Sequence, residues 1–237
     1  MKPHLHFPHP AGSGLFGRRR GMWASALVIA ALGVAGCAGP NECATNVPPK
    51  SVENFFSFWS RLAPDIKRVV VLPIACDPQR PELLDGCTLL QPILETELTK
   101  TGRFEVVPAN AESLCIRTGS DFWTGSEVLP NDFLTGLREQ YGCDAVLFCQ
   151  LTEFRSYSPL AVGWRMRLVE VRSRQTLWAV DEMFDGGNAS VLSGATQYQA
   201  AEEGPVSKRS GHWPISVSPR RFAQYAAAQI LATLPER

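Results

Sequence analysis

The first 36 residues of this 237-residue chain differ from the rest in composition, and they decide where the folded part can begin. Arg18, Arg19 and Arg20 form a basic cluster, and an uncharged run rich in Ala, Leu, Val and Ile follows at residues 21–36. A basic cluster followed by a short apolar run is typical of a secretory signal peptide. The run is shorter than the roughly 20 residues that a membrane-spanning helix needs. We therefore expect residues 1–36 to be removed rather than to span the membrane.

The apolar run ends in small residues followed by a cysteine. The sequence at 34–37, Val-Ala-Gly-Cys, resembles the bacterial lipobox, in which the cysteine is acylated and the chain is cut just before it. This resemblance implies lipidation of Cys37, and Ala38 in place of Asp implies the outer membrane, on its periplasmic side. The alternative is an ordinary signal followed by a chance cysteine. Arg19 and Arg20 also resemble a twin-arginine signal, so both export routes stay open.

Composition divides the chain into three parts. We predict a lipoprotein signal peptide at 1–36, a lipidated cysteine and tether at 37–64, and a single periplasmic domain at 65–237 with loop excursions at 110–130 and 186–217. Lys+Arg and Asp+Glu number 23 each, but the signal peptide holds four of the bases and none of the acids. The mature chain therefore carries a net charge of −4, which argues against a basic nucleic-acid binder.

Cysteine usage fits export to an oxidising compartment. Six cysteines remain after the lipidated one, an even number that allows full pairing in 15 ways: Cys43, Cys76, Cys87, Cys115, Cys143 and Cys149. We favour a disulfide between Cys76 and Cys87, because they bracket one short loop. Cys149 lies in an apolar run and can equally be a small buried hydrophobe.

Hydrophobic periodicity predicts alternating strands and helices. The predicted strands are 68–74, 104–108, 145–154, 164–171 and 176–184, and the predicted helices begin near 90, at 131 or 132, and at 219. This β-α-β-α-β-β-β-α order gives an α/β (α+β) fold, with a mixed sheet and helices packed on one face.

Two further segments stand out by their residue types. The aromatic segment from Phe55 to Trp59 predicts an amphipathic helix that caps the core, with contact near the membrane surface as the alternative. Arg165 and Arg167 alternate with apolar residues, which indicates a strand with a basic outer face. That outer face is solvated or meets an anionic partner.

The order of elements resembles the small α/β domain shared by the curli-secretion lipoprotein CsgG, the lipoprotein activators of penicillin-binding proteins and the N-terminal domain of TolB. The matching segments are 69–73, 98–107, 143–147 and 176–180. The turn at 172–175 departs from the family pattern because it lacks glycine. The long loops also lack the paired alternating segments of membrane-crossing hairpins, so the resemblance favours a non-catalytic envelope module over a pore.

Catalytic motifs are missing from the sequence, and His212 is the one histidine left in the mature chain. We therefore expect no enzyme, no cofactor and no metal site. The candidate partner-binding residues are large aromatics in predicted loops, which can alternatively fold back onto the core: Phe122, Trp123, Tyr198 and Trp213.

The expected partners are the membrane, through the anchor on Cys37, and an unidentified envelope protein, with no nucleic acid. A homo-oligomer also fits the sequence. Two alternatives from other functional classes stay open: an oligomeric CsgG-like component of a secretion channel or export apparatus, and an envelope enzyme of unknown reaction.

Overall fold

A computed structural model of the protein describes residues 47–203 and 213–237. Predictions that concern the signal peptide, Cys37, Cys43 and His212 lie outside these described residues. Within the described ranges, no helix combines the length and the apolar character needed to cross a membrane.

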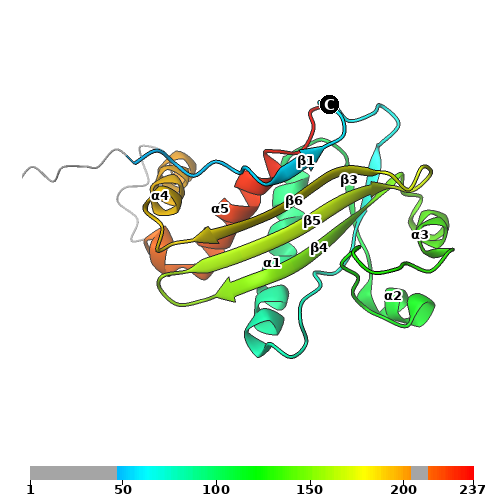
Figure 1. Cartoon of the computed structure of the whole chain (residues 1–237), viewed down its shortest axis with the longest axis horizontal. Helices are drawn as coiled ribbons and strands as arrows, with labels where there is room; N and C mark the ends of the chain where they lie inside the picture. The colour runs from blue at the N-terminus through cyan, green and yellow to red at the C-terminus, as the bar shows by residue number, and fades with distance from the viewer. Residues whose placement is uncertain (1–46, 204–212) are drawn as a thin grey trace, which may run out of the picture. The chain divides into compact units, whose positions relative to one another are not determined.

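The described chain forms a six-stranded sheet with helices packed against it (Figure 1). The strands are β1 (Phe55–Ser57), β2 (Arg68–Val71), β3 (Glu105–Pro108), β4 (Ala145–Arg155), β5 (Ala161–Glu170) and β6 (Thr176–Asp185). The helices are α1 (Pro81–Lys100), α2 (Ala111–Thr118), α3 (Phe133–Tyr141), α4 (Ala189–Glu203) and α5 (Pro219–Leu231), with a short 3-10 helix at Ile215–Val217.

The sheet is mixed, as the order of elements predicted. Its strands run in the order β1-β6-β5-β4-β2-β3. β2 is parallel to both β3 and β4, because helical connections return the chain to the same end of the sheet. β4, β5 and β6 are antiparallel neighbours joined by short turns. The turn at 172–175 closes without glycine by placing Arg174 at φ 59°, in the left-handed region.

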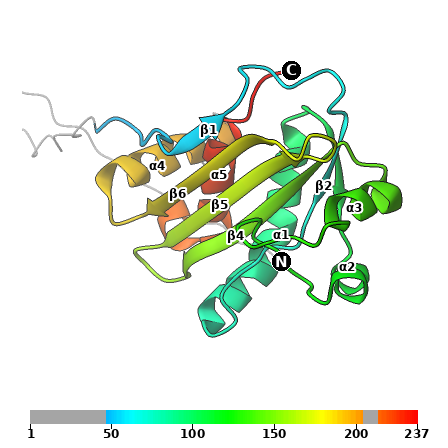
Figure 2. The ribbon, with the colours of Figure 1, turned by 45° about the vertical axis from the view of Figure 1, so that its right-hand side comes forward.

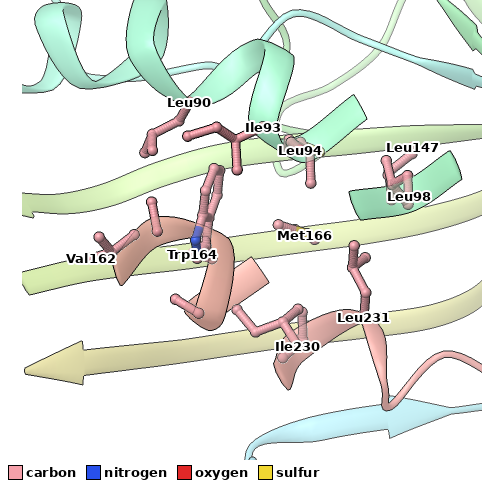
Figure 3. Close-up of a cluster of buried hydrophobic side chains, with 14 of the residues drawn as sticks. Leu90, Ile93, Leu94, Leu98, Leu147, Val162, Trp164, Met166, Ile230 and Leu231 are labelled. Atoms are coloured by element: carbon pink, nitrogen blue, oxygen red, sulfur yellow. The ribbon is translucent and has the colours of Figure 1, made fainter. Parts of the chain in front are cut away.

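The larger core lies between the sheet and helices α1 and α5 (Figure 3). Side chains alternate across a strand, so Trp164 and Met166 of β5 point to this face, where α1 supplies Leu90 and Leu94. The side chain of Trp164 is fully buried. The predicted closing helix is confirmed: Pro219 is its first residue, and the hydroxyl of Ser218 accepts a hydrogen bond from the first turn.

A second core lies on the opposite face, which corrects our expectation that helices would cover one face alone. Phe133 and Leu137 of α3 pack there against Val70, Val146 and Phe148 of the sheet. Figure 2 shows α2 and α3 at one end of the sheet, away from α4 and α5. Two helix layers therefore cover β2 from both sides, as its continuous run of valines requires.

Two helices occupy segments that we predicted as loops. α2 begins after Asn110, whose side chain accepts a hydrogen bond from the amide of Ser113 at 2.8 Å, and it ends at Gly119 with φ 78°. α4 packs through small residues, among them Gly194 and Ala195, and therefore shows little hydrophobic periodicity. Both helices are real elements that the apolar pattern does not reveal.

α1 and the aromatic segment also differ from the predictions. α1 begins at Pro81 rather than near Leu90, and it continues through Pro92. Pro81 suits the first turn, where its missing N–H costs nothing. The predicted helix at the aromatic segment is wrong, because residues 55–57 form β1, paired antiparallel with β6.

Candidate functional site

The sheet face turned away from α1 and α5 contains a groove with a volume of about 290 Å³. Over β5, β6 and β1, no helix of the described chain covers this face (Figure 2). Phe56 stands on one side of the groove, Thr124 and Ser126 lie on the other, and Arg165 and Asp181 project between them. We take this groove as the candidate functional site.

The β1 side of the groove is held in place by a carboxylate on β6. Glu182 is only 11% exposed, and its oxygens accept hydrogen bonds from Lys50 Nζ at 2.9 Å and from the amide of Glu53 at 3.2 Å. The side-chain amide of Asn54 also donates to the carbonyl of Asp181 at 2.8 Å. These bonds attach the segment before β1 to the centre of β6.

The environment of Glu182 favours its ionised form. Burial works to raise its pKa, but the hydrogen bonds from Lys50 and from the backbone outweigh burial, so the pKa of Glu182 lies below its ordinary value. The carboxylate is therefore charged at neutral pH, and it attracts the Lys50 ammonium group across the edge of the sheet.

The opposite side of the groove is a loop between α2 and α3. Glu127 shapes this loop by accepting a hydrogen bond from the amide of Thr124 at 2.8 Å and another from the amide of Ser126 at 3.0 Å. Burial raises the pKa of Glu127, but its hydrogen bonds, led by that from Thr124, lower it below the ordinary value. Arg167 ties the loop to β5 by donating to the carbonyl of Gly125 at 2.7 Å.

Gly125 is required where the loop meets the sheet. Its φ is +75°, and a Cβ atom built there would lie 2.9 Å from the ring of Phe148. Both the left-handed backbone and the close approach exclude a side chain. The loop can therefore lie against the sheet only with glycine at this position.

The groove carries balanced charge rather than the basic face that the sequence indicated. Arg165 forms an ion pair with Asp181 at 2.6 Å, and both side chains are partly exposed. Arg167 is engaged by the loop carbonyl and by Thr176. An exposed ion pair contributes little free energy to stability. Arg165 and Asp181 can therefore separate and bind charged or polar groups of a ligand instead. Beside the exposed ring of Phe56, this arrangement suits an extended polypeptide.

The four aromatic candidates from the sequence lie elsewhere and do not form one site. Trp123 packs on Phe133 with ring centroids 5.0 Å apart, and its Nε1 donates to Thr118 at 3.0 Å. Tyr198 packs on Tyr225 at 5.8 Å. Phe122 is partly exposed, and the side chain of Trp213 is 76% exposed.

The pair of cysteines that we favoured is brought together. Cys76 and Cys87 are present as free thiols, and Cys76 lies near enough to Cys87 to affect the pKa of its thiol. Burial, followed by the contact with Cys76, raises the pKa of the Cys87 thiol. Cys149 is fully buried, and this burial raises the pKa of its thiol as well.

The described residues hold no cluster of three or more His, Cys, Asp or Glu side chains placed to bind a metal ion. The sequence missed the groove itself. Two sequence features belong to the groove: the aromatic segment and the alternation of Arg165 with apolar neighbours. Neither feature indicates that Phe56 pairs with Ala179, which lies 123 positions later in the chain.

No model of a known protein family matches the sequence, and no curated protein is similar to it in sequence. Solved structures with a similar fold include a PelC dodecamer from Paraburkholderia phytofirmans, with 19% identity over 78% of this chain and 96% of PelC and a TM-score of 0.46. Lipoprotein GNA1162 from Neisseria meningitidis has 21% identity over 58% of this chain and 96% of its own, with a TM-score of 0.40.

TolB from Acinetobacter baumannii has 18% identity over 65% of this chain and 33% of its own, with a TM-score of 0.30. TolB is one of the relatives that the sequence suggested, whereas a likeness to CsgG is not shown. At these identities the likeness concerns the fold alone.

Replacing Glu182 by Gln should loosen the segment before β1. The Glu182→Gln side chain keeps its size but loses the charge that attracts Lys50, which should lower the local opening free energy of residues 53–57 by roughly 1 to 3 kcal/mol. Hydrogen exchange of these amides measures the change. Glu139→Gln, at an exposed carboxylate on α3, is the control, and equal exchange in both variants would contradict the assigned role.

The same carboxylate predicts a dependence on pH. Because the folded pKa of Glu182 is lowered, its contribution is fully present above the ordinary pKa of about 4.3 and is lost as the pH falls through the folded value. Protection of the β1 amides in the wild type should therefore fall only below about pH 4. Protection in Glu182→Gln should show no such step.

Proposed function

We propose that this protein is a lipoprotein of the bacterial cell envelope, anchored on the periplasmic side of the outer membrane through acyl chains on Cys37. Its domain acts as a non-catalytic module that binds another envelope protein. The module takes up an extended segment of that partner in the groove between β1 and the loop of Gly125. Assembly into a homo-oligomer stays a prediction.

The observation that carries this proposal is the construction of the groove. Phe56 offers an apolar ring to a ligand, because 50% of the surface of this residue is exposed. Arg165 and Asp181 offer one donor group and one acceptor group on a partly exposed floor. Both sides of the groove are fixed by hydrogen bonds before a ligand arrives, so binding need not order them.

Export and anchoring are supported by the sequence. The basic cluster, the apolar run and the small residues before Cys37 occur in the order that a lipoprotein signal requires. Several acyl chains on one residue give stable attachment, because each buried methylene contributes about 0.8 kcal/mol.

The partner should crosslink through the groove. A photoreactive benzoylphenylalanine at Ser126 should give a discrete crosslinked protein in intact cells, whereas the same residue at Glu139 on α3 should not. Arg165→Glu places two like charges beside each other and should reduce the crosslink several-fold. Equal crosslinking from both positions, or no effect of Arg165→Glu, would count against the groove.

The anchor is tested by labelling with radioactive palmitate. The wild-type protein should incorporate the label, and Cys37→Ser should not, because it lacks the thiol that accepts the acyl chain. Cys115→Ser should label like the wild type. Label retained in Cys37→Ser would exclude lipidation at this residue.

An oxidising compartment also implies a disulfide between the adjacent thiols of Cys76 and Cys87. Two electrons and two protons would pass from the thiols to a disulfide-containing oxidoreductase as the sulfurs join. Closing this short loop should stabilise the protein by about 2–3 kcal/mol.

Peptide mapping without reductant should find the linked peptides, and Cys76→Ser should lower the free energy of unfolding by a similar amount. Cys115→Ser is the control and should retain the stability of the wild type. Protein purified from the periplasm with both thiols free would contradict the disulfide.

A further inference from the structure

Exposed aromatic residues gather at one edge of the sheet. Phe55, Phe58 and Trp59 lie within five consecutive positions, and each is at least 40% exposed, whereas Phe56 between them faces the groove. The rings of Phe58 and Trp59 meet edge to face with centroids 4.7 Å apart. We call Phe55, Phe58 and Trp59 the aromatic edge. So much apolar surface in one place indicates a contact with another body.

The backbone of β1 is also open on its outer side. The carbonyl of Asn54 accepts from the amide of Asp181, and the amide of Phe58 donates to the carbonyl of Leu177. In an antiparallel pair these bonds alternate along the strand, so the backbone groups of Phe55 and Ser57 point away from β6. An open apolar edge is a liability in water unless it is covered.

The chain enters the domain along this same edge. The carbonyl of Val47 accepts from the hydroxyl of Ser193 on α4, and the amide of Lys50 donates to the carbonyl of Ser190. From α4 the segment runs beside β6 to β1 (Figure 1). Cys37 precedes Val47 by ten residues, which span about 35 Å at full extension. A bilayer that holds acyl chains on Cys37 is therefore within reach of the aromatic edge.

Two cationic side chains line a cleft of about 550 Å³ that also includes Trp59 of the aromatic edge. Arg61 and Arg237 line this cleft together with Leu62 and Pro64. Neither guanidinium takes part in an ion pair with another described residue, and that of Arg237 donates one hydrogen bond to the carbonyl of Ile66 at 3.3 Å. A guanidinium group presents donors that match the oxygens of a phosphate.

We propose that the aromatic edge lies on the phospholipid surface of the membrane that holds the anchor, with Arg61 and Arg237 at the level of the headgroup phosphates. This inference rests on the proposed lipid anchor. A Trp side chain suits the boundary between acyl chains and headgroups because its indole N–H can stay hydrated, and the Phe rings add apolar surface that can enter the acyl region. In this position the membrane covers the open edge of β1. The groove, which lies on the face of the sheet, stays uncovered next to the bilayer.

The test uses the full lipidated protein in vesicles of phosphatidylethanolamine and phosphatidylglycerol whose acyl chains carry bromine, which quenches tryptophan fluorescence on contact. The wild-type fluorescence should be quenched, and Trp59→Phe should remove at least half of that quenching. Trp213→Phe, at an exposed tryptophan whose carbonyl accepts a hydrogen bond from Arg221 of α5, should leave it unchanged. Both substitutions conserve an aromatic ring and lie at the surface, so the fold is retained.

The outcomes separate this inference from the proposed anchor. Protein that fails to float with the vesicles would overturn the anchor. Protein that floats but shows equal quenching in the wild type and in Trp59→Phe would overturn the membrane contact alone. If Trp59 were shielded from both bromolipid and aqueous iodide, a protein would cover the edge, which would also overturn the inference.

Arg61→Gln with Arg237→Gln should reduce quenching in vesicles that contain phosphatidylglycerol, and unchanged quenching would remove the arginines from the contact.

Discussion

The pairing of β1 with β6 is the interaction on which the groove and the aromatic edge both depend. This pairing is short, involving three residues, and it gains support from the partly buried carboxylate of Glu182 and its bonds to Lys50 and Glu53. Without the pairing, Phe56 would not stand beside Arg165, and the groove would lose one side. The aromatic edge would likewise lose the sheet that presents it.

Local patterns were sufficient to predict most of the sheet. The valines of β2, the hairpin of β5 and β6 and the proline at the start of α5 each carry a signal within a few residues. α2 and α4 were not predicted, because neither has a clear apolar periodicity. α2 is capped by Asn110, and α4 packs through Gly194. Their formation depends on a single cap or on a close approach of backbones, and neither produces a hydrophobic pattern.

The candidate site was less predictable than the fold because it depends on distant pairings. Arg165 was correctly placed on the outer face of a strand, but its ion pair with Asp181 requires the register between β5 and β6. The role of Gly125 depends on the ring of Phe148, which reaches it only after the loop returns to the sheet. The contact of Cys76 with Cys87 was accessible to the sequence because both residues belong to one short loop and the helix after it.

The attachment of the N-terminal segment at successive points has a mechanical consequence. A force applied to the chain before Val47 would first load its bond to α4 and the backbone bond between Lys50 and Ser190. Glu182 would carry the load next, and the strand itself would bear tension last. These bonds would break before the pull reached the core, because each of them lies along the chain ahead of β1.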